Sequence, residues 1–401
     1  MRLLLLSETF PPPMNGGSEI YVYQLAQLVA PHTTRVIAPV NPGAAAWDAA
    51  APFEVVRPPF YHPSWQFPFP RFAAHLVRLT GEVTQQARSF GATAILTGPA
   101  FPNAIVGWRA AAALGIPWAT ILYGEEAYQV NRGRNLFSPL RRVLLHAPLR
   151  RAPHVFTISA FSKAEALRSG ARPDAIEMVY PGVDPVEFHP GLDGTMIRAR
   201  HGIGTRPMLL SCGRLYHRKG QDALIRALPA ILREIPDVCA VLVGEGMNRE
   251  MLGDLARDLG VADRVIFAGS VPREELPLYY AACDVFVMTY RQRTLGETLD
   301  TEGFGIVLVE AGACGKPAVA HHVGGTADAI IDGVTGFLLE EGDEPLLVDT
   351  LVRLLRDPAL RARLGAAGRA RVERDLTWNA AAAHVRHALE GAVSGTRHAG
   401  G

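Results

Sequence analysis

Short apolar runs alternate with segments of helical periodicity along almost the whole chain. The apolar runs that predict strands are 3–6, 35–38, 94–97, 119–122 and 155–158, then 208–211, 238–243, 265–268, 285–288 and 318–320. The helical patterns include 19–29, 73–89, 221–234, 249–259 and 306–314. Because strands and helices alternate, the sequence predicts an α/β fold with parallel, doubly wound sheets.

The pattern occurs twice, and a polar stretch separates the two halves. This stretch begins at Tyr180-Pro181-Gly182-Val183-Asp184-Pro185 and continues to Gly204, and we expect it to link two domains. The expected domains are residues 1–190 and 200–376, both Rossmann-like and facing a cleft. A helical pattern at 377–391 is expected to pack back on the first domain. Ligands of such sheets bind beyond the carboxyl ends of the strands.

Composition and charge narrow the class of protein. The chain has 401 residues, of which 48% are hydrophobic and 20% charged, as is typical of soluble globular proteins. The net charge of +1 gives no general attraction for nucleic acid, so we expect no nucleic-acid partner. No apolar run is long enough to span a bilayer, and the apolar start of the chain is too short for a signal peptide.

The four cysteines indicate a reducing compartment. Cys212, Cys239, Cys283 and Cys314 lie in apolar or small-residue segments, and none of them forms a C-x-x-C pair. We therefore expect buried, reduced thiols and a cytoplasmic protein.

The segment from Asp300 to Glu310 carries the most specific chemistry. Two carboxylates, Glu302 and Glu310, lie eight positions apart around a Gly-Phe-Gly turn, and an apolar run that can begin a helix follows the turn. Backbone N–H groups at a turn and a helix start bind anions. The carboxylates suit sugar hydroxyls, so this segment predicts a site for a nucleotide sugar.

A basic loop follows the first strand of the second half. In this loop Arg214 can bind phosphate through two hydrogen bonds, and Lys219 can add a point charge. An ordinary solvated basic turn is the alternative. No two aspartates stand two positions apart, so no D-x-D metal site is expected. Arg214, Lys219 and a helix start would then neutralise a departing diphosphate.

Glycine turns follow three other strands. Gly16 and Gly17 come after the first strand, where backbone could approach a phosphate closely, although the G-x-G-x-x-G fingerprint of dinucleotide-binding proteins is missing. The alternative there is a tight turn in which Ser18 caps a helix. Gly246 and Val271 lie in turns that could contact a base or ribose, or that serve only the fold.

These motifs together resemble the retaining GT-B glycosyltransferases of family 4. The resemblance covers most of the chain and rests on Gly16-Gly17, Gly213-Arg214…Lys219-Gly220, and Glu302-Gly303-Phe304-Gly305…Glu310. Further matches are Tyr180-Pro181-Gly182-Val183-Asp184…Phe188, Gly315-Lys316-Pro317, Gly324-Gly325 and Asp332-Gly333-Val334-Thr335-Gly336-Phe337.

The resemblance implies a role for each matched residue. It implies that Arg214 and Lys219 bind the donor diphosphate, that Glu310 holds the ribose hydroxyls and that Glu302 faces the donor sugar. Backbone groups of Gly303, Phe304, Gly305 and Ile306 would contact sugar hydroxyls and phosphate. Gly16 and Gly17 would close over the diphosphate from the first domain, which is the acceptor side. The reaction would retain the anomeric configuration by a front-face substitution, without a metal and with no cofactor besides the nucleotide-sugar co-substrate.

One position departs from the family pattern. Members often carry His-Gly-x-Glu after a strand of the first domain, whereas this chain has Tyr123-Gly124-Glu125-Glu126. Tyr123 stands where the His is expected to contact the donor sugar, and a phenol can also form hydrogen bonds. Tyr123 and Gly124 are therefore candidate sugar contacts. A non-catalytic nucleotide-sugar binding protein stays open as an alternative, and a GT-B epimerase is a more distant one.

The donor and acceptor are less well specified. Leu299-Asp300-Thr301-Glu302-Gly303 is similar to the equivalent stretch of bacterial phosphatidylinositol-mannoside mannosyltransferases, which favours GDP-mannose over UDP-glucose or UDP-N-acetylglucosamine. The acceptor would be a glycan, a lipid-linked glycan or a small molecule.

Two stretches suggest peripheral contact with the inner face of a membrane. The first is the aromatic loop 60–70, and the second is the helical stretch that carries Arg141, Arg142, Arg150 and Arg151. A packed cover loop and an ordinary amphipathic helix are the alternatives.

Overall fold

The structure, a computed structural model, describes residues 1–14, 16–62, 71–134, 136–295 and 298–398. Contacts divide these residues into two units. Unit 1 contains Met1–Pro181 together with Leu295, 298–299 and 378–398, and unit 2 contains Gly182–Thr294 and Asp300–Thr377. Unit 1 thus ends its first segment at Pro181, earlier than the expected 190, and unit 2 begins at Gly182, earlier than the expected 200.

Unit 1 is built on a parallel sheet of seven strands in the order β3-β2-β1-β4-β5-β6-β7. The strands are β1 (Leu3–Ser7), β2 (Thr34–Ile37), β3 (Glu54–Val56), β4 (Ala94–Gly98), β5 (Trp118–Leu122), β6 (His154–Thr157) and β7 (Ile176–Met178). All five residues of β1 are buried, because the strand lies in the middle of a sheet that is covered on both faces.

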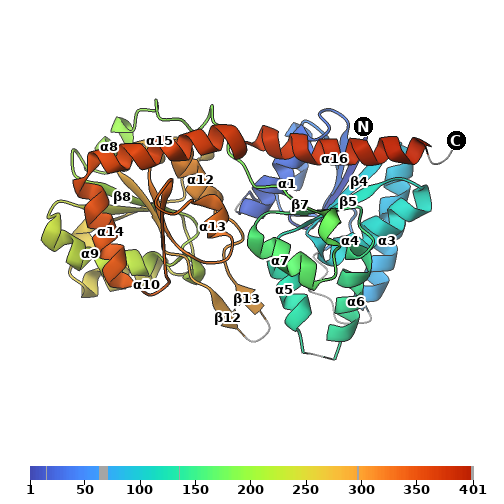
Figure 1. Ribbon diagram of the computed structural model, residues 1–401, viewed down its shortest axis with the longest axis horizontal. Coiled ribbons are helices and arrows are strands. Elements are labelled where there is room, and N and C mark those ends of the chain that lie inside the picture. Colours follow the sequence, from blue (N-terminus) through green and yellow to red (C-terminus); the bar gives the residue numbers. More distant parts are fainter. Residues whose placement is uncertain (15, 63–70, 135, 296–297, 399–401) are drawn as a thin grey trace. The chain divides into compact units, whose positions relative to one another are not determined.

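The helices of unit 1 follow its strands, and the last one comes from the far end of the chain. They are α1 (Gly17–Leu28), α2 (Ala44–Ala50), α3 (Arg71–Phe90), α4 (Ala100–Leu114), α5 (Glu125–Arg132), α6 (Ser138–Leu149), α7 (Ala160–Arg168), the short η2 (Pro173–Ala175) and α16 (Trp378–His398). Helix α16 lies against α1, where Arg386 Nε donates to Val29 O at 2.7 Å (Figure 1). It continues beyond the expected end at residue 391.

Unit 2 repeats the plan with six parallel strands in the order β10-β9-β8-β11-β14-β15. The strands are β8 (Met208–Cys212), β9 (Cys239–Val243), β10 (Val265–Gly269), β11 (Val285–Met288), β14 (Ala318–His321) and β15 (Gly336–Leu339). A separate two-stranded sheet pairs β12 (Arg293–Leu295) with β13 (Thr298–Asp300).

Helices also follow the strands of unit 2. They are α8 (Thr195–Arg200), α9 (Gln221–Glu234), α10 (Arg249–Asp258), α11 (Leu276–Ala282), α12 (Ile306–Ala313), α13 (Thr326–Ala329), α14 (Glu344–Arg356) and α15 (Pro358–Asp375), with the short η3 (His217–Lys219), η4 (Ala262–Arg264) and η5 (Arg273–Glu275). The four cysteines all lie in this unit, and all are buried and free.

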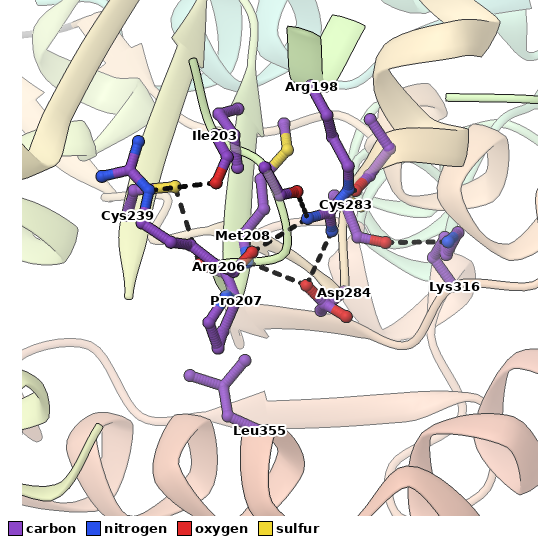
Figure 2. A network of polar contacts seen from close by, with 12 residues as sticks. Arg198, Ile203, Arg206, Pro207, Met208, Cys239, Cys283, Asp284, Lys316 and Leu355 are labelled. Carbon is purple, nitrogen blue, oxygen red and sulfur yellow. Dashed lines mark hydrogen bonds and ion pairs between the residues drawn. The ribbon is translucent and has the colours of Figure 1, made fainter. Parts of the chain in front are cut away.

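A polar network fastens the amino ends of the strands in unit 2 (Figure 2). The Asp284 carboxylate accepts hydrogen bonds from Met208 N–H at 2.8 Å and from the Arg198 guanidinium at 3.0 Å. Lys316 Nζ donates to Ala281 O at 2.8 Å and to Cys283 O at 2.7 Å. The lysine of the Gly315-Lys316-Pro317 motif therefore stabilises the fold at the end of the sheet opposite the carboxyl ends of its strands.

Both sheets reverse their strand order next to their first strand. In unit 1 the order reverses between β1 and β4, and in unit 2 it reverses between β8 and β11. The loops that leave two such strands diverge to opposite faces, which opens a crevice at the carboxyl ends. The fold therefore places the ligand-binding edge of unit 2 at the loops after β8 and β11.

Candidate functional site

The loops after β8 and β11 are locked to each other. Gly220, which precedes α9, has φ +70°, and a Cβ at this position would lie 1.7 Å from Thr289 O. In return, Thr289 Oγ1 donates to Gly220 O at 2.6 Å. Only glycine fits this close approach with a left-handed backbone, so the glycine fixes the loop that carries Arg214 and Lys219.

The strand ends of β8, β9 and β10 are joined by backbone hydrogen bonds. Gly213 N–H donates to Val243 O at 2.9 Å, and Gly244 N–H donates to Gly269 O at 2.8 Å. A Cβ at Gly246 would lie 2.3 Å from Leu215 O, so the close packing of these turns requires a glycine there. Val271 follows β10 at the same edge and is half-buried. Contact of Gly246 and Val271 with a nucleotide stays a prediction.

Lys219 and Glu302 form an ion pair at this edge. Lys219 Nζ lies 2.6 Å from Glu302 Oε2, and the two side chains are 15% and 13% exposed. Burial alone would raise the pKa of Glu302, but the positive charges of Lys219 and Arg218 outweigh it and lower that pKa. Burial lowers the pKa of Lys219, and Glu302 opposes this effect. The pair brings together two residues predicted to act on the donor.

Arg214 and Arg218 differ in what they contact. Arg214 is exposed, and no hydrogen bond or ion pair within the described ranges engages its guanidinium. Arg218 donates to Thr301 O and lies 3.3 Å from Asp300 Oδ1, so it holds the strand end that leads into Glu302. The predicted phosphate ligand Arg214 is thus open to a ligand, whereas Arg218, which the sequence did not single out, positions the neighbouring loop.

The predicted Gly-Phe-Gly turn leads directly into a helix. Helix α12 begins at Ile306, and its N-cap is Gly305 with φ +95° and no side-chain capping hydrogen bond. The backbone just before this turn is fixed by a residue from another loop, because Gly325 N–H donates to Glu302 O at 2.8 Å. The Gly303–Ile306 backbone thus forms a turn and an uncapped helix start, a combination that binds anions.

Glu310 lies inside α12 and is only 3% exposed. Its Oε2 accepts a hydrogen bond from the Tyr280 hydroxyl at 2.7 Å. Burial raises the pKa of Glu310, although Arg273 and the Tyr280 hydrogen bond oppose that rise. A buried carboxylate with a polar neighbour could serve ribose hydroxyls, and that role stays a prediction. Tyr280 and Arg273 are further neighbours that the sequence did not single out.

Gly16 and Gly17 lie in unit 1, after β1. Helix α1 begins at Gly17, and its N-cap Gly16 has an extended backbone and no side-chain cap. Ser18 lies inside the helix and donates to Glu19 at 3.1 Å, so the alternative in which Ser18 caps the helix is wrong. No described side chain caps the start of α1, but the Glu19 carboxylate lies beside it, since a Cβ at Gly16 would be 2.6 Å from Glu19 Oε2. Contact of Gly16 and Gly17 with a diphosphate stays a prediction.

Tyr123 and Gly124 form the turn between β5 and α5. The Glu126 carboxylate accepts the N–H groups of Tyr123 at 2.9 Å and of Gly124 at 3.0 Å. Gly124 has φ +109°, and a Cβ there would lie 2.7 Å from the Phe161 ring. Glu126, the glutamate of this motif, therefore stabilises the turn.

The Tyr123 side chain is set against Tyr21. Its ring lies edge-on to the Tyr21 ring at a centroid distance of 6.2 Å. Its hydroxyl is buried and has no hydrogen bond of normal geometry to a described residue. Burial, Tyr21 and Glu126 raise the pKa of Tyr123, and a polar contact with Thr9 lowers it. The phenol therefore stays protonated, and its contact with a donor sugar stays a prediction.

The basic helical stretch forms α6 and its flanks in unit 1. Four apolar side chains are exposed there, Leu136, Phe137, Leu140 and Val143. Two of the predicted arginines are engaged in the fold, since Arg142 donates to Gly133 O at 2.8 Å and Arg151 to Ala147 O at 3.1 Å. Residues 63–70 of the aromatic loop lie outside the described residues. No described helix combines the length and hydropathy needed to cross a membrane.

Two sequence profiles match the chain. The profile for Glycosyltransferase Family 4 matches residues 15–187, and the profile for Glycosyl transferases group 1 matches residues 194–371.

Several curated proteins are similar over nearly the full length. A protein of Mycolicibacterium smegmatis is 35% identical over 97% of this chain and 98% of its own length, and is named GDP-mannose-dependent alpha-(1-6)-phosphatidylinositol monomannoside mannosyltransferase. A GDP-mannose-dependent monoacylated alpha-(1-6)-phosphatidylinositol monomannoside mannosyltransferase of Corynebacterium glutamicum is 31% identical over 94% of both chains. A D-inositol 3-phosphate glycosyltransferase of Frankia alni is 39% identical over 56% of both chains.

Solved structures share the fold. HepE from Anabaena, in complex with UDP, matches with a TM-score of 0.79 and 23% identity over 98% of this chain and all of its own. Sucrose-phosphate synthase from Thermosynechococcus elongatus matches with a TM-score of 0.79 and 24% identity over 98% of this chain and 99% of its own.

Proposed function

Because the chain belongs to family 4 of the glycosyltransferases and has the GT-B fold, we propose that it transfers mannose from GDP-mannose with retention of configuration. The observation that carries the proposal is the meeting of the Lys219–Glu302 pair and the uncapped start of α12 at the strand ends of unit 2. The choice of GDP-mannose is supported by the names of two relatives that match 97% and 94% of this chain.

The Lys219–Glu302 ion pair can separate when the donor binds, so that each residue contacts a different part of the donor. In the structure, Glu302 neutralises Lys219, and Lys219 Nζ lies 2.6 Å from Glu302 Oε2. A bound diphosphate would attract Lys219, and the freed Glu302 carboxylate would then accept hydrogen bonds from sugar hydroxyls. Arg214, Lys219 and the N–H groups of α12 would neutralise the charge that develops on the departing phosphate. These groups would do without a metal ion, so we expect turnover to persist in chelator.

Retention follows from a front-face substitution. The bond from the anomeric carbon to the phosphate oxygen breaks, and the acceptor oxygen bonds to the same face of that carbon. The acceptor proton passes to the departing phosphate oxygen. Neither glutamate is then a nucleophile, which agrees with the contacts of Glu302 with Lys219 and of Glu310 with Tyr280.

We propose a lipid-linked acceptor and peripheral contact with an anionic membrane. The names of the two mannosyltransferase relatives include phosphatidylinositol mannosides. In this chain Leu140 and Val143 on α6 are 39% and 58% exposed, and Arg141 adjoins Leu140 in the sequence. Apolar side chains beside arginines suit the interface of an anionic bilayer. A free inositol phosphate is the second candidate acceptor, because a D-inositol 3-phosphate glycosyltransferase matches 56% of the chain.

A thermal-shift screen with GDP, UDP, ADP and their sugar conjugates tests the donor. A ligand at a hundred times its dissociation constant adds about 2.7 kcal/mol of stability. We expect GDP and GDP-mannose to raise the unfolding temperature selectively. A selective response to UDP would replace the donor, and no response to any nucleotide would overturn the proposal. With an acceptor in hand, the NMR coupling constant of the new glycosidic bond shows whether configuration is retained.

A further inference from the structure

Tyr290 carries a buried polar group that the fold does not use. It lies two positions after β11, and none of its surface is exposed. Its hydroxyl has no hydrogen-bond partner among the described residues. Native proteins pair nearly all buried polar atoms, so an unpaired hydroxyl at a ligand-binding edge requires an explanation.

The surroundings hold this side chain in one place. Lys219 Nζ lies 4.9 Å from the centre of the Tyr290 ring, and His321 Nδ1 donates to Tyr290 O at 3.0 Å. The Tyr290 hydroxyl lies 3.7 Å from where a Cβ at Gly305 would be. Gly305 is the N-cap of α12, so the hydroxyl lies close to the uncapped start of that helix.

We infer that the Tyr290 hydroxyl donates a hydrogen bond to the distal phosphate of the donor's diphosphate, beside Lys219 and the start of α12. The inference rests on the proposed function and adds a residue to it. Phosphate oxygens only accept hydrogen bonds, so a phenol O–H matches them, as do the lysine and the helix N–H groups.

Two features of the structure fit this role. Burial raises the pKa of Tyr290 and Glu302 raises it further, against Arg218, so the phenol keeps its proton and can donate. The Lys219 ammonium, which lies over the Tyr290 ring, is paired with Glu302. When a diphosphate draws Lys219 away from Glu302, the start of α12 and the phenol become open to the same anion.

Tyr290→Phe tests the inference, because it removes the hydroxyl and keeps the ring. Loss of an unpaired hydroxyl should leave the unfolding temperature without ligand unchanged or higher. Binding of GDP, measured by calorimetry, should weaken by roughly ten- to a hundredfold, the range for a hydrogen bond to a charged group. Binding of GMP, which lacks the distal phosphate, should not change.

Tyr279→Phe is the matched control. Tyr279 is equally buried, but its hydroxyl is hydrogen-bonded to His201 Nε2 at 3.0 Å. This control should lower the unfolding temperature and leave the affinity for GDP unchanged.

The outcomes separate the inference from the proposed function. Equal affinity of Tyr290→Phe and wild type for GDP would overturn the inference and leave the proposed function standing. An equal loss of affinity for GDP and GMP would also overturn it, because the hydroxyl would then not contact the distal phosphate. Failure of the wild type to bind any nucleoside diphosphate would overturn both.

Discussion

At the scale of single residues, most cationic side chains of the candidate donor site are neutralised by nearby carboxylates. Lys219 is neutralised by Glu302, and Arg218 is tied to Asp300 and Thr301. Arg214 alone among these cations has no side-chain partner in the described part of unit 2. An incoming diphosphate would therefore meet one open guanidinium first and would gain Lys219 by exchange.

The first prediction concerns these two cations. The double variant Arg214→Ala with Lys219→Ala should cut turnover by orders of magnitude, because the departing diphosphate loses its charge neutralisation. A single oxyanion donor is worth about 2.7–4 kcal/mol on the barrier. The measurement is the rate at which the nucleoside diphosphate is released from the sugar donor. Arg226→Ala, on the exposed side of α9 and paired only weakly with Asp222 at 3.8 Å, should keep the wild-type rate. A double variant with near wild-type turnover would contradict the phosphate assignment.

The second prediction concerns Glu310 and pH. Burial raises the pKa of Glu310 in the folded protein above its ordinary value of 4.5, so the folded state holds the proton more tightly than the unfolded chain. The contribution of this protonation to the free energy of unfolding is fully present below pH 4.5 and is lost as the pH rises through the folded-state pKa. Glu310→Gln stays neutral and can still accept from Tyr280, so it should gain stability relative to wild type as pH rises.

Unfolding temperatures of wild type and Glu310→Gln between pH 4 and 8 provide the measurement. A difference that stays constant across this range would contradict the raised pKa. Glu310→Ala should in addition weaken nucleotide binding, because the ribose hydroxyls lose an acceptor. Unchanged nucleotide affinity would show that Glu310 has no such role.

Sequence reasoning singled out some residues of the candidate site and not others, for a physical reason. Arg214, Lys219, Glu302 and Glu310 were predicted because charged residues at fixed offsets from a glycine turn are visible in one dimension. Tyr290 was missed, since its interest lies in an unpaired hydroxyl, which only a three-dimensional structure shows. The rule that ligands meet strand ends could have drawn attention to it, because a strand was predicted at 285–288.

At the scale of elements, glycines set how closely the strand-end loops approach each other. Gly220 and Gly260 both have a left-handed backbone, with φ +70° and +67°. A Cβ at Gly220 would lie 1.7 Å from Thr289 O, whereas a Cβ at Gly260 would meet nothing within 4 Å. The two positions thus separate the cost of backbone strain from the cost of a steric clash.

The third prediction uses this pair. Gly260→Ala should destabilise unit 2 by about 1–2 kcal/mol through backbone strain alone. Gly220→Ala should cost clearly more, because the clash with Thr289 adds to the strain, and it should weaken nucleotide binding as the Arg214 loop shifts. Denaturant unfolding followed by nucleotide titration measures both effects. Equal losses of stability in the two variants would show that the loop at Gly220 can shift to accommodate the added methyl group.

Most central strands could be predicted from the sequence, and the missed ones share a position. The prediction for 285–288 has the bounds of β11, and those for β1, β4 and β8 differ at most by one residue. The chain pattern did not predict β3, β7 or β15, each at the edge of its sheet, nor β12 and β13 of the two-stranded sheet, although it did predict the edge strand β10. Edge strands are partly exposed and short, so they lack the continuous apolar run of a buried parallel strand.

At the scale of the whole molecule, the fourth prediction concerns the α6 face of unit 1, by which we mean the exposed side chains of Leu140 and Val143. The protein should sediment with vesicles that contain phosphatidylglycerol and less with pure phosphatidylcholine, and added salt should weaken the binding. Leu140→Glu with Val143→Glu should abolish the binding, because it places charge on the exposed apolar side chains. Val186→Glu, on an 81% exposed residue of unit 2, is the control. Binding by the double variant at the wild-type level would contradict the proposed face.

The return of the chain to unit 1 governs the order in which the protein can be completed during synthesis. Strand β1 and helix α1 are translated before unit 2, whereas α16, which lies against α1, is translated after it. All of unit 2 lies between these two segments of unit 1 in the chain. The nascent chain must therefore carry an uncovered apolar α1 face while unit 2 folds, a period in which chaperones can bind it. Unit 1, whose first segment is translated before unit 2, is thus completed only after unit 2 has been made.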